Sequence, residues 1–278
     1  MRRFGHSSAN VPAIGQGTWQ MEGDDRASAV QSLKLGIELG LTHVDTAEMY
    51  GSGRVEELVA EAIAGQRQRV FLVSKVLPDN ASRKGTIRAC ENTLKRLNTD
   101  HLDCYLLHWP GRHPLSDTIA AFEELESAGK IRSWGVSNFD ETELDQALSI
   151  AGPGRIACNQ VLYHLGERSI EHAVLPWCEA NGVTLVGYTP FGRAKFPPSG
   201  SGGDALARIA KSRGKTVRQV ALAFLTRKPN LFAIPKASKP EHVRDNAGAL
   251  GLELSPEEIG AIDAGFPMSK KRRGVPML

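Results

Sequence analysis

The segment LDCYLLH, residues 102–108, is the clearest strand in this chain of 278 residues. Its central run, CYLL, is apolar at every position and lacks the alternation that marks a half-exposed strand. Continuous apolar runs of this length are typical of parallel strands that are covered on both faces. The segment therefore predicts a buried strand of a parallel sheet, ending at the polar residue His108.

Similar short runs recur along the chain, with helical patterns between them. We expect further strands at residues 42–48, 69–75, 133–138, 157–163, 184–190 and 231–236, and a short one near 251–254. Capping boxes predict helix starts at 216–219 and 255–258, where a hydroxyl residue is followed three positions later by Gln or Glu. Regular alternation of strand and helix predicts a parallel sheet, and eight repeats favour a closed (β/α)8 TIM barrel.

Two segments lie outside this repeat. Residues 4–15 predict a small β-hairpin before the barrel begins. The stretch PPSGSGG, residues 197–203, has the composition of a mobile loop rather than of a domain boundary. Because a barrel of this kind needs about 250 residues, we expect a single domain, residues 1–278.

Composition argues against several classes of function. Lys and Arg number 34 against 31 Asp and Glu, and a net charge of +3 is too small to favour nucleic acid or a membrane as partner. No apolar stretch approaches the roughly 20 residues of a membrane helix, and the N-terminus lacks the apolar core of a secretory signal. The four cysteines are scattered and the eight histidines show no metal-ligand spacing. We therefore expect a soluble, cytoplasmic protein with reduced thiols and no metal.

Polar residues stand where the predicted strands end. Asp45 ends the first strand with Tyr50 shortly after it, Lys75 ends the second and His108 the third. Each residue alone has a structural explanation, such as a capped turn or a solvated strand end. Their recurrence at one rim favours function, because barrel enzymes place their active sites at the carboxyl ends of the strands. The later strands add Ser137, Asn138, Gln160, Tyr188 and Lys236 at the same rim.

Asp45, Tyr50, Lys75 and His108 form a set that suits reduction of a carbonyl group. A carbonyl that accepts hydride becomes an alkoxide and needs a proton donor, which Tyr50 can be. A neighbouring ammonium, Lys75, lowers the pKa of a tyrosine from its usual value of about 10. A buried ammonium in turn needs a carboxylate, which Asp45 supplies. His108 is expected to hydrogen-bond and polarise the substrate carbonyl.

Segments along nearly the whole chain resemble the aldo-keto reductase family. Any one of them is weak evidence, but together and in the family's order they are highly specific. They are GQGTW (15–19), HVDTAEMYG (43–51), VSK (73–75), LDCYLLHWP (102–110), GKIRSWGVSNF (129–139), CNQVLYH (158–164), GYTPFG (187–192) and IPKAS (234–238).

The resemblance implies a barrel whose N-terminal hairpin closes the bottom and a nicotinamide cofactor that lies extended across the rim. Tyr188 would stack on the nicotinamide, and Ser137, Asn138 and Gln160 would bind its carboxamide. Backbone groups of 189–193 would contact the pyrophosphate. The other residues implied in cofactor binding are Thr18, Trp19, Thr189, Pro190, Phe191, Gly192, Arg193, Lys236 and Ser238 at the 2′-phosphate, His242, and Asn246 near the adenine.

One departure from the family's pattern concerns the choice of cofactor. Many members that prefer NADPH carry Arg six residues after the motif lysine, where this chain has His242, and Ser directly after it, where this chain has Ala237. Lys236, Ser238, Lys239 or Arg244 can compensate, since a 2′-phosphate needs charge and donors rather than one particular side chain. We expect NADPH as cofactor, with use of NADH also realistic.

The substrate is expected to be a small carbonyl compound. Trp19, Met21 and Trp109 predict an apolar, aromatic-lined substrate site, with Met49 and Phe191 nearby. The tail at 269–278 is short, which in this family implies an open pocket with broad specificity. Methylglyoxal, other 2-oxoaldehydes and sugar-derived aldehydes are the expected substrates of a monomeric enzyme.

Two other functions remain open from the sequence. On the same barrel, Lys75 can be the nucleophile of a Schiff-base aldolase, although Tyr50 and the segments GVSNF and YTPFG then go unexplained. Alternatively, the barrel binds the nucleotide with negligible turnover and reports redox state to a partner, a function against which the intact catalytic set argues.

Overall fold

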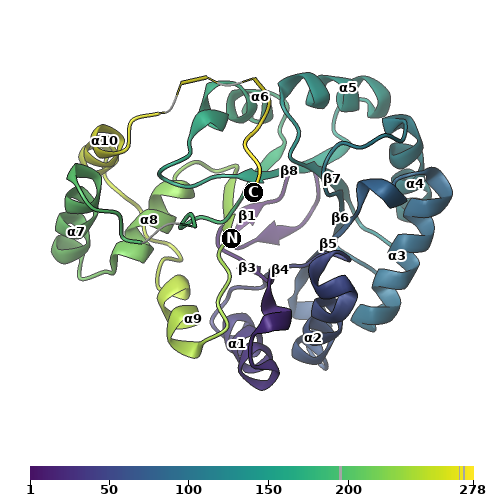
Figure 1. The fold of residues 1–278 in the computed structure, drawn as a ribbon, viewed down its shortest axis with the longest axis horizontal. Coiled ribbons are helices and arrows are strands. Elements are labelled where there is room, and N and C mark those ends of the chain that lie inside the picture. The colour runs from purple at the N-terminus through teal and green to yellow at the C-terminus, as the bar shows by residue number, and fades with distance from the viewer. Residues whose placement is uncertain (194–195, 269, 272) are drawn as a thin grey trace.

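Eight parallel strands form the centre of the molecule, and helices surround them (Figure 1). The computed structural model describes residues 1–193, 196–268, 270–271 and 273–278. The strands follow one another in chain order around the sheet, from β3 to β10. Bridges from Ile14 to Ala233 and from Gly17 to Lys236 join the first strand to the last. The sheet is thereby closed, and the predicted (β/α)8 barrel is confirmed.

The barrel strands are short, and each lies within or close to a predicted segment except the first. Their bounds are β3 (Gln16–Gly17), β4 (His43–Asp45), β5 (Phe71–Val76), β6 (Cys104–Leu107), β7 (Trp134–Ser137), β8 (Ile156–Leu162), β9 (Thr184–Tyr188) and β10 (Leu231–Ile234).

The helices alternate with these strands. They are α1 (Arg26–Glu38), α2 (Arg54–Ile63), α3 (Arg83–Leu97), α4 (Leu115–Ser127), α5 (Glu141–Ala151), α6 (Val174–Ala180), α7 (Ser201–Arg213), α8 (Val217–Leu225), α9 (Pro240–Ala247) and α10 (Pro256–Gly265). The 3-10 turns are η1 (Met21–Gly23), η2 (Tyr50–Gly53), η3 (Arg67–Arg69), η4 (Pro78–Asn80) and η5 (Ser169–His172). None of the helices among the described residues has the length and apolar character needed to cross a bilayer.

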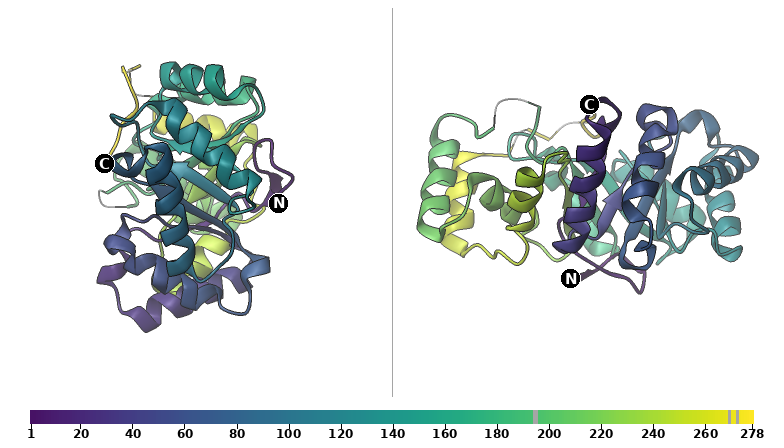
Figure 2. Two further views of the ribbon diagram at one scale, coloured as in Figure 1. Left: turned by 90° about the vertical axis from the view of Figure 1, so that its right-hand side faces the viewer. Right: turned by 90° about the horizontal axis from the view of Figure 1, so that it is seen from below.

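The expected N-terminal hairpin is present and closes one end of the barrel. Strands β1 (Arg2–Arg3) and β2 (Asn10–Val11) pair antiparallel. Phe4, at the turn side of β1, is fully buried, and its ring lies 4.7 Å from that of Phe71 and 5.4 Å from that of Phe232. The chain therefore starts at the bottom of the barrel, and Figure 2 shows its C-terminal end on the opposite side.

Both predicted capping boxes are confirmed. The Thr216 hydroxyl accepts the backbone N–H of Gln219, whose side chain accepts the N–H of Thr216, and so α8 begins. Ser255 and Glu258 start α10 in the same way. These local signals were readable from sequence because every partner lies within three residues.

Three sequence-based expectations about elements were wrong. The segment 251–254 is a loop before α10, and the first barrel strand is Gln16–Gly17, where we expected no strand. A two-residue strand containing glycine carries no periodicity to recognise. The 197–203 stretch is not a loop throughout, because α7 begins at Ser201. Gly202 lies where α7 meets α10, and a Cβ there would come within 2.7 Å of the Gly265 carbonyl oxygen. Glycine serves close helix packing at this position.

His43 lies at the bottom of the barrel in an apolar setting. Its ring meets the rings of Phe4 and Phe71 edge-on, at 5.7 and 5.6 Å. Neither ring nitrogen has a hydrogen-bond partner among the described residues. Burial lowers the pKa of His43 to about 4, so the side chain is neutral in the folded protein at pH 7.

We predict that His43 makes the protein less stable in mild acid. Between pH 6.5 and 4 the unfolded chain binds a proton at this position and the folded chain does not, so the free energy of unfolding decreases as the pH falls. His43→Leu should remove this contribution, which has a limiting slope of about 1.4 kcal/mol per pH unit. Urea unfolding at pH 7, 6 and 5 measures it, with His242→Gln at an exposed position as control. Parallel curves for the wild type and His43→Leu would contradict the prediction.

Candidate active site

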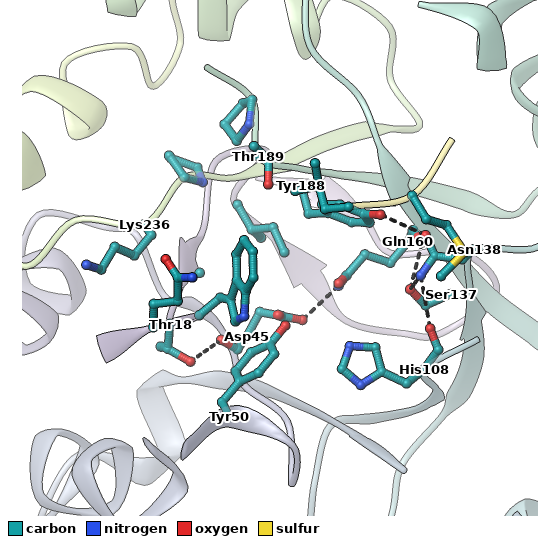
Figure 3. A pocket seen from close by; sticks show the side chains of 18 of the residues that line it. Thr18, Asp45, Tyr50, His108, Ser137, Asn138, Gln160, Tyr188, Thr189 and Lys236 are labelled. Atoms are coloured by element: carbon teal, nitrogen blue, oxygen red, sulfur yellow. Dashed lines mark hydrogen bonds between the residues drawn. The ribbon is translucent and has the colours of Figure 1, made fainter. Parts of the chain in front are cut away.

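Four strand-end residues meet at the open rim of the barrel, and Figure 3 shows Asp45, Tyr50 and His108 among them. Asp45 ends β4, Tyr50 begins η2, Lys75 lies in β5, and His108 follows β6. The Lys75 ammonium donates to Asp45 Oδ1 at 2.6 Å, to the Thr46 carbonyl oxygen at 2.8 Å and to the Tyr50 hydroxyl oxygen at 3.3 Å. The structure thus brings together the four residues that the sequence predicted as the catalytic set.

Strand geometry explains why these side chains share one space. Alternate residues of a strand face the same side, so Phe71, Val73 and Lys75 all face the inside of the barrel. The first two are apolar and pack in the lower barrel, whereas Lys75 reaches the rim. Cys104 and Leu106 precede His108 in the same way. Strands β5 and β6 therefore each supply apolar side chains to the lower barrel interior and one polar catalytic side chain at the rim.

Lys75 and Tyr50 each influence the pKa of the other. Burial opposes the charged form of Lys75, but the Asp45 carboxylate and Tyr50 outweigh it and raise the pKa of Lys75. For Tyr50, burial raises the pKa above its usual value and exceeds the opposing effect of Lys75. Lys75 thus lowers the pKa of Tyr50, as the sequence predicted, but burial of the phenol outweighs this effect. Tyr50 is a protonated phenol at neutral pH and is able to donate.

His108 is neutral and faces Tyr50. Burial, with a smaller effect of the Lys75 charge, lowers the pKa of His108 to about 2. Its Nδ1 has no hydrogen-bond partner among the described residues, and the ring centroids of His108 and Tyr50 lie 5.8 Å apart. The His108 carbonyl oxygen accepts a hydrogen bond from Asn138 Nδ2 at 3.0 Å, which fixes the backbone. His108 lines the cavity, where its neutral ring can meet a polar atom of a ligand.

A chain of amides and hydroxyls forms the adjoining wall. Gln160 Nε2 donates to Asp45 Oδ2 at 2.8 Å, and the Ser137 hydroxyl donates to the Gln160 carbonyl oxygen at 2.8 Å. The Tyr188 hydroxyl donates to Asn138 Oδ1 at 2.9 Å, and burial raises the pKa of Tyr188 to about 12. Asn138 has φ 62°, a left-handed conformation that asparagine tolerates better than most residues. This network links the Tyr188 ring to the Asp45–Lys75 pair.

These groups line a cavity of about 400 Å³. Of the predicted residues outside the catalytic set, its lining includes Thr18, Trp19, Trp109, Ser137, Asn138, Gln160, Tyr188, Thr189, Pro190, Phe191, Gly192, Arg193 and Lys236. At the mouth, the Arg193 guanidinium lies 5.2 Å from the centroid of the Trp19 ring, across the groove between β3 and β9. The lining thus contains both aromatic and basic side chains.

Some predicted site residues lie elsewhere. Met21 does not line the cavity: it is 1% exposed and packs into the core that surrounds the barrel, because η1 turns it inward. Ser238 precedes α9 and His242 and Asn246 belong to it, all three outside the lining of the main cavity. Sequence reasoning did not assign Gln20, Ile234, Pro235, Met277 and Leu278, which do line it. Ile234 and Pro235 belong to the segment IPKAS, in which only Lys236 and Ser238 were assigned a role, whereas no motif marks Gln20, Met277 and Leu278.

The tail is short, but contrary to expectation it reaches the cavity. Met277 and Leu278 line the cavity, and Figure 1 shows the C-terminal end over the barrel. Val275 packs against the core, which brings the chain back across the rim. The tail is basic at 270–273 and apolar only at its end, so its composition does not indicate contact with the cavity. Residues 269 and 272 of this tail lie outside the described residues.

We predict that Asp45→Asn strongly destabilises the fold. The Lys75 side chain is 0% exposed, and the substitution leaves its ammonium without a charged partner. Breaking such a buried pair costs about 3–5 kcal/mol in unfolding free energy. Chemical denaturation measures the loss. The surface pair Arg26–Glu61 provides the control, because Glu61→Gln should leave stability nearly unchanged. Equal effects of the two substitutions would refute the prediction.

A second prediction concerns pH. Because the pKa of His108 is about 2, its ionisation contributes no step to the pH profile of catalysis near 6.5. The ratio kcat/KM, measured between pH 5.5 and 8, should show no such step. If the wild type lost activity with an apparent pKa near 6.5, and His108→Gln removed that step, a neutral His108 would be disproved.

Comparisons with known proteins agree with this geometry. The model of the aldo/keto reductase family matches residues 13–265. Methylglyoxal reductase YeaE of Escherichia coli strain K12 is 44% identical over 272 residues, which cover 97% of this chain and 96% of that protein. Glyoxal reductase of Bacillus subtilis is 31% identical over 259 residues, covering 93% and 90%.

Solved structures give the same result. An aldo/keto reductase from Klebsiella pneumoniae in complex with NADP and acetate has a TM-score of 0.92 and 46% identity, covering 100% of this chain and 99% of that chain. An aldo-keto reductase from the same organism in complex with NADPH has a TM-score of 0.91 and 45% identity, covering 100% of both. This chain belongs to the aldo/keto reductase family, and it is an oxidoreductase.

Proposed function

We propose that this reductase converts small 2-oxoaldehydes, methylglyoxal among them, to the corresponding alcohols, with NADPH as hydride donor. The observation that carries the proposal is the contact of Tyr50 with the buried Lys75–Asp45 pair on the floor of the cavity. Such a pair supplies what carbonyl reduction needs, a proton donor whose conjugate base is stabilised at once.

In the proposed reaction the substrate carbonyl oxygen lies between Tyr50 and His108. NADPH, when bound, supplies a hydride to the carbonyl carbon. The oxygen, which gains negative charge, takes the Tyr50 proton, and the Lys75 ammonium stabilises the phenolate left behind. His108 donates a hydrogen bond to the same oxygen from its neutral ring. Solvent returns the proton to Tyr50 before the next turnover.

The residues at the rim fit an extended nicotinamide dinucleotide. Tyr188 is half-buried, lines the cavity and offers a face to the nicotinamide ring. In this proposal Ser137, Asn138 and Gln160 bind the carboxamide, and the backbone of 189–193 contacts the pyrophosphate. Thr189 and Gly192 have φ of 54° and 67°, which turns the peptide units of this loop sharply. Lys236 and Ser238 meet the 2′-phosphate, with His242 and Asn246 at the adenosine end.

The proposed substrate follows from the cavity and from the relatives. Trp19, Met49 and Trp109 make its mouth aromatic and apolar, and the volume of about 400 Å³ suits a small carbonyl compound beside the nicotinamide. The relatives named above are a methylglyoxal reductase and a glyoxal reductase. A monomer in the cytoplasm is part of the same proposal.

The geometry argues against a Schiff-base aldolase. A nucleophilic lysine must be a neutral amine, whereas the pKa of Lys75 is raised by Asp45 and Tyr50 against the effect of burial. All three contacts of the ammonium are to oxygen atoms that a neutral amine would satisfy less well. We therefore expect no borohydride-trapped adduct with carbonyl substrates.

Tyr50→Phe tests the proposal. We predict a loss of roughly 10²–10⁴-fold in kcat for methylglyoxal reduction, the range that a positioned general acid contributes. NADPH oxidation at 340 nm measures it. Tyr105→Phe is the matched control, because its hydroxyl is fully buried away from the cavity and has no hydrogen-bond partner among the described residues. That variant should retain full activity.

Two outcomes would oppose the proposal. Undiminished turnover in Tyr50→Phe would remove Tyr50 from the role of proton donor. Tight binding of NADPH, seen as fluorescence quenching, without turnover of any 2-oxoaldehyde or aromatic aldehyde would instead favour a barrel that binds the nucleotide for a regulatory purpose.

A further inference from the structure

An ion pair joins the two walls of the cofactor groove at its basic end. The Lys236 ammonium contacts the carboxylate of Asp24, a residue more than 200 positions earlier in the chain. Lys236 follows β10 and lines the cavity, whereas Asp24 lies between η1 and α1. Their side chains are 34% and 29% exposed, so the pair is only partly screened by solvent.

The folding of the 24–28 segment does not require Asp24. The neighbouring Asp25 is the N-cap of α1, and its carboxylate accepts the Ser28 N–H at 2.8 Å. The Ser28 hydroxyl donates to the Ser238 carbonyl oxygen at 2.8 Å, which ties the first turn of α1 to the segment after Lys236. The cap and this tie hold the two walls together without the ion pair. The charge of Asp24 is thus free to serve another purpose.

The carboxylate depends strongly on Lys236. Asp24 Oδ2, the atom nearest to the ammonium, is shielded from water and has no other partner among the described residues. A shielded carboxylate oxygen that loses its cation is left without compensation, which is unfavourable. Another anion that binds Lys236 must therefore compensate the free energy lost when Asp24 gives up this contact. It must also overcome its own repulsion by the Asp24 carboxylate.

Lys236 is the cation that matters most for such an anion. Within the described residues it is the lysine that lines the cavity. Lys239 and Arg244 are exposed, so solvent weakens the attraction of their charges for an anion. At position 242 the chain has a histidine in place of an arginine. A phosphate arriving at this end of the groove thus meets one lysine, and that lysine is already paired.

We propose that Asp24 is a cofactor-selectivity residue, which weakens binding of the 2′-phosphate by competing for Lys236; this inference rests on the cofactor placement in the proposed function. The 2′-phosphate of NADPH brings a charge of about −1.5 to −2, so it and Asp24 repel each other across one ammonium. NADH carries a neutral 2′-hydroxyl and leaves the ion pair in place. Asp24 therefore reduces the difference between the affinities for NADPH and NADH, so that NADH remains usable.

The test measures dissociation constants of NADP⁺ and NAD⁺ by quenching of tryptophan fluorescence. In Asp24→Asn we expect NADP⁺ to bind about fivefold more tightly, the size of one partly exposed charge interaction, and NAD⁺ to change by less than about twofold. Asp25→Asn is the matched control: it removes the same charge one residue away and keeps a good N-cap. It should change neither constant. The KM values for NADPH and NADH should follow the same pattern.

A double-mutant cycle locates the effect. If Asp24 acts through Lys236, the gain from Asp24→Asn should disappear in a Lys236→Met background. Adenosine 2′-monophosphate and adenosine 5′-monophosphate provide a test without the nicotinamide half. Asp24→Asn should strengthen the inhibition by the 2′-phosphate alone.

The inference is overturned if Asp24→Asn changes both cofactors equally, weakens both, or acts the same way as Asp25→Asn. In each of those cases Asp24 would act as a structural contact between the two segments, or as a surface charge with no specific effect on the 2′-phosphate. These results differ from a failure of the proposed function. A wild-type protein that binds NADP⁺ but reduces no carbonyl refutes the function, whereas normal turnover with unchanged cofactor selectivity in Asp24→Asn refutes this inference alone.

Discussion

The fully buried Lys75 ammonium is the group on which the site depends. A charge without water must be met by oxygen atoms at fixed positions, and here Asp45, the Thr46 carbonyl and Tyr50 provide them. Each of these lies on or just after β4, so the lysine in β5 locks two neighbouring strand ends together. The same contacts give Tyr50 a cation beside its hydroxyl. These contacts therefore compensate the buried charge of Lys75 and prepare Tyr50 for proton transfer.

From that pair the constraint extends around the rim. Gln160 holds the second oxygen of Asp45, Ser137 donates to the Gln160 backbone, and Asn138 fixes the backbone of His108. Four strands thus contribute to one hydrogen-bonded arc. The arc needs a closed barrel, because β8 reaches Asp45 across the interior rather than from a neighbouring strand. The apolar layer below, plugged by Phe4, keeps water away from this interior.

The groove is crossed by contacts of a different kind. Arg193 over Trp19 and Lys236 with Asp24 both link the segment after β3 to the opposite wall. They use exposed or half-exposed cations, which can change partners, although Asp24 loses a favourable contact when Lys236 does so. The floor of the site is rigid and its upper edge is held by exchangeable pairs. This division suits an enzyme whose cofactor enters and leaves while the proton donor stays in place.

The sequence by itself determined the repeat, the capping boxes and the rim positions of Asp45, Tyr50, Lys75 and His108, because these follow from local periodicity and from the rule that parallel strands end at one side. Tertiary structure alone decided the rest. Met21 faces the core, Met277 and Leu278 reach the cavity, and Gln16–Gly17 forms a strand only through pairing with β4 and residues after β10. The sign of the Tyr50 pKa shift also depends on burial that no motif records. Long-range packing sets these features, and its partners lie far apart in the chain.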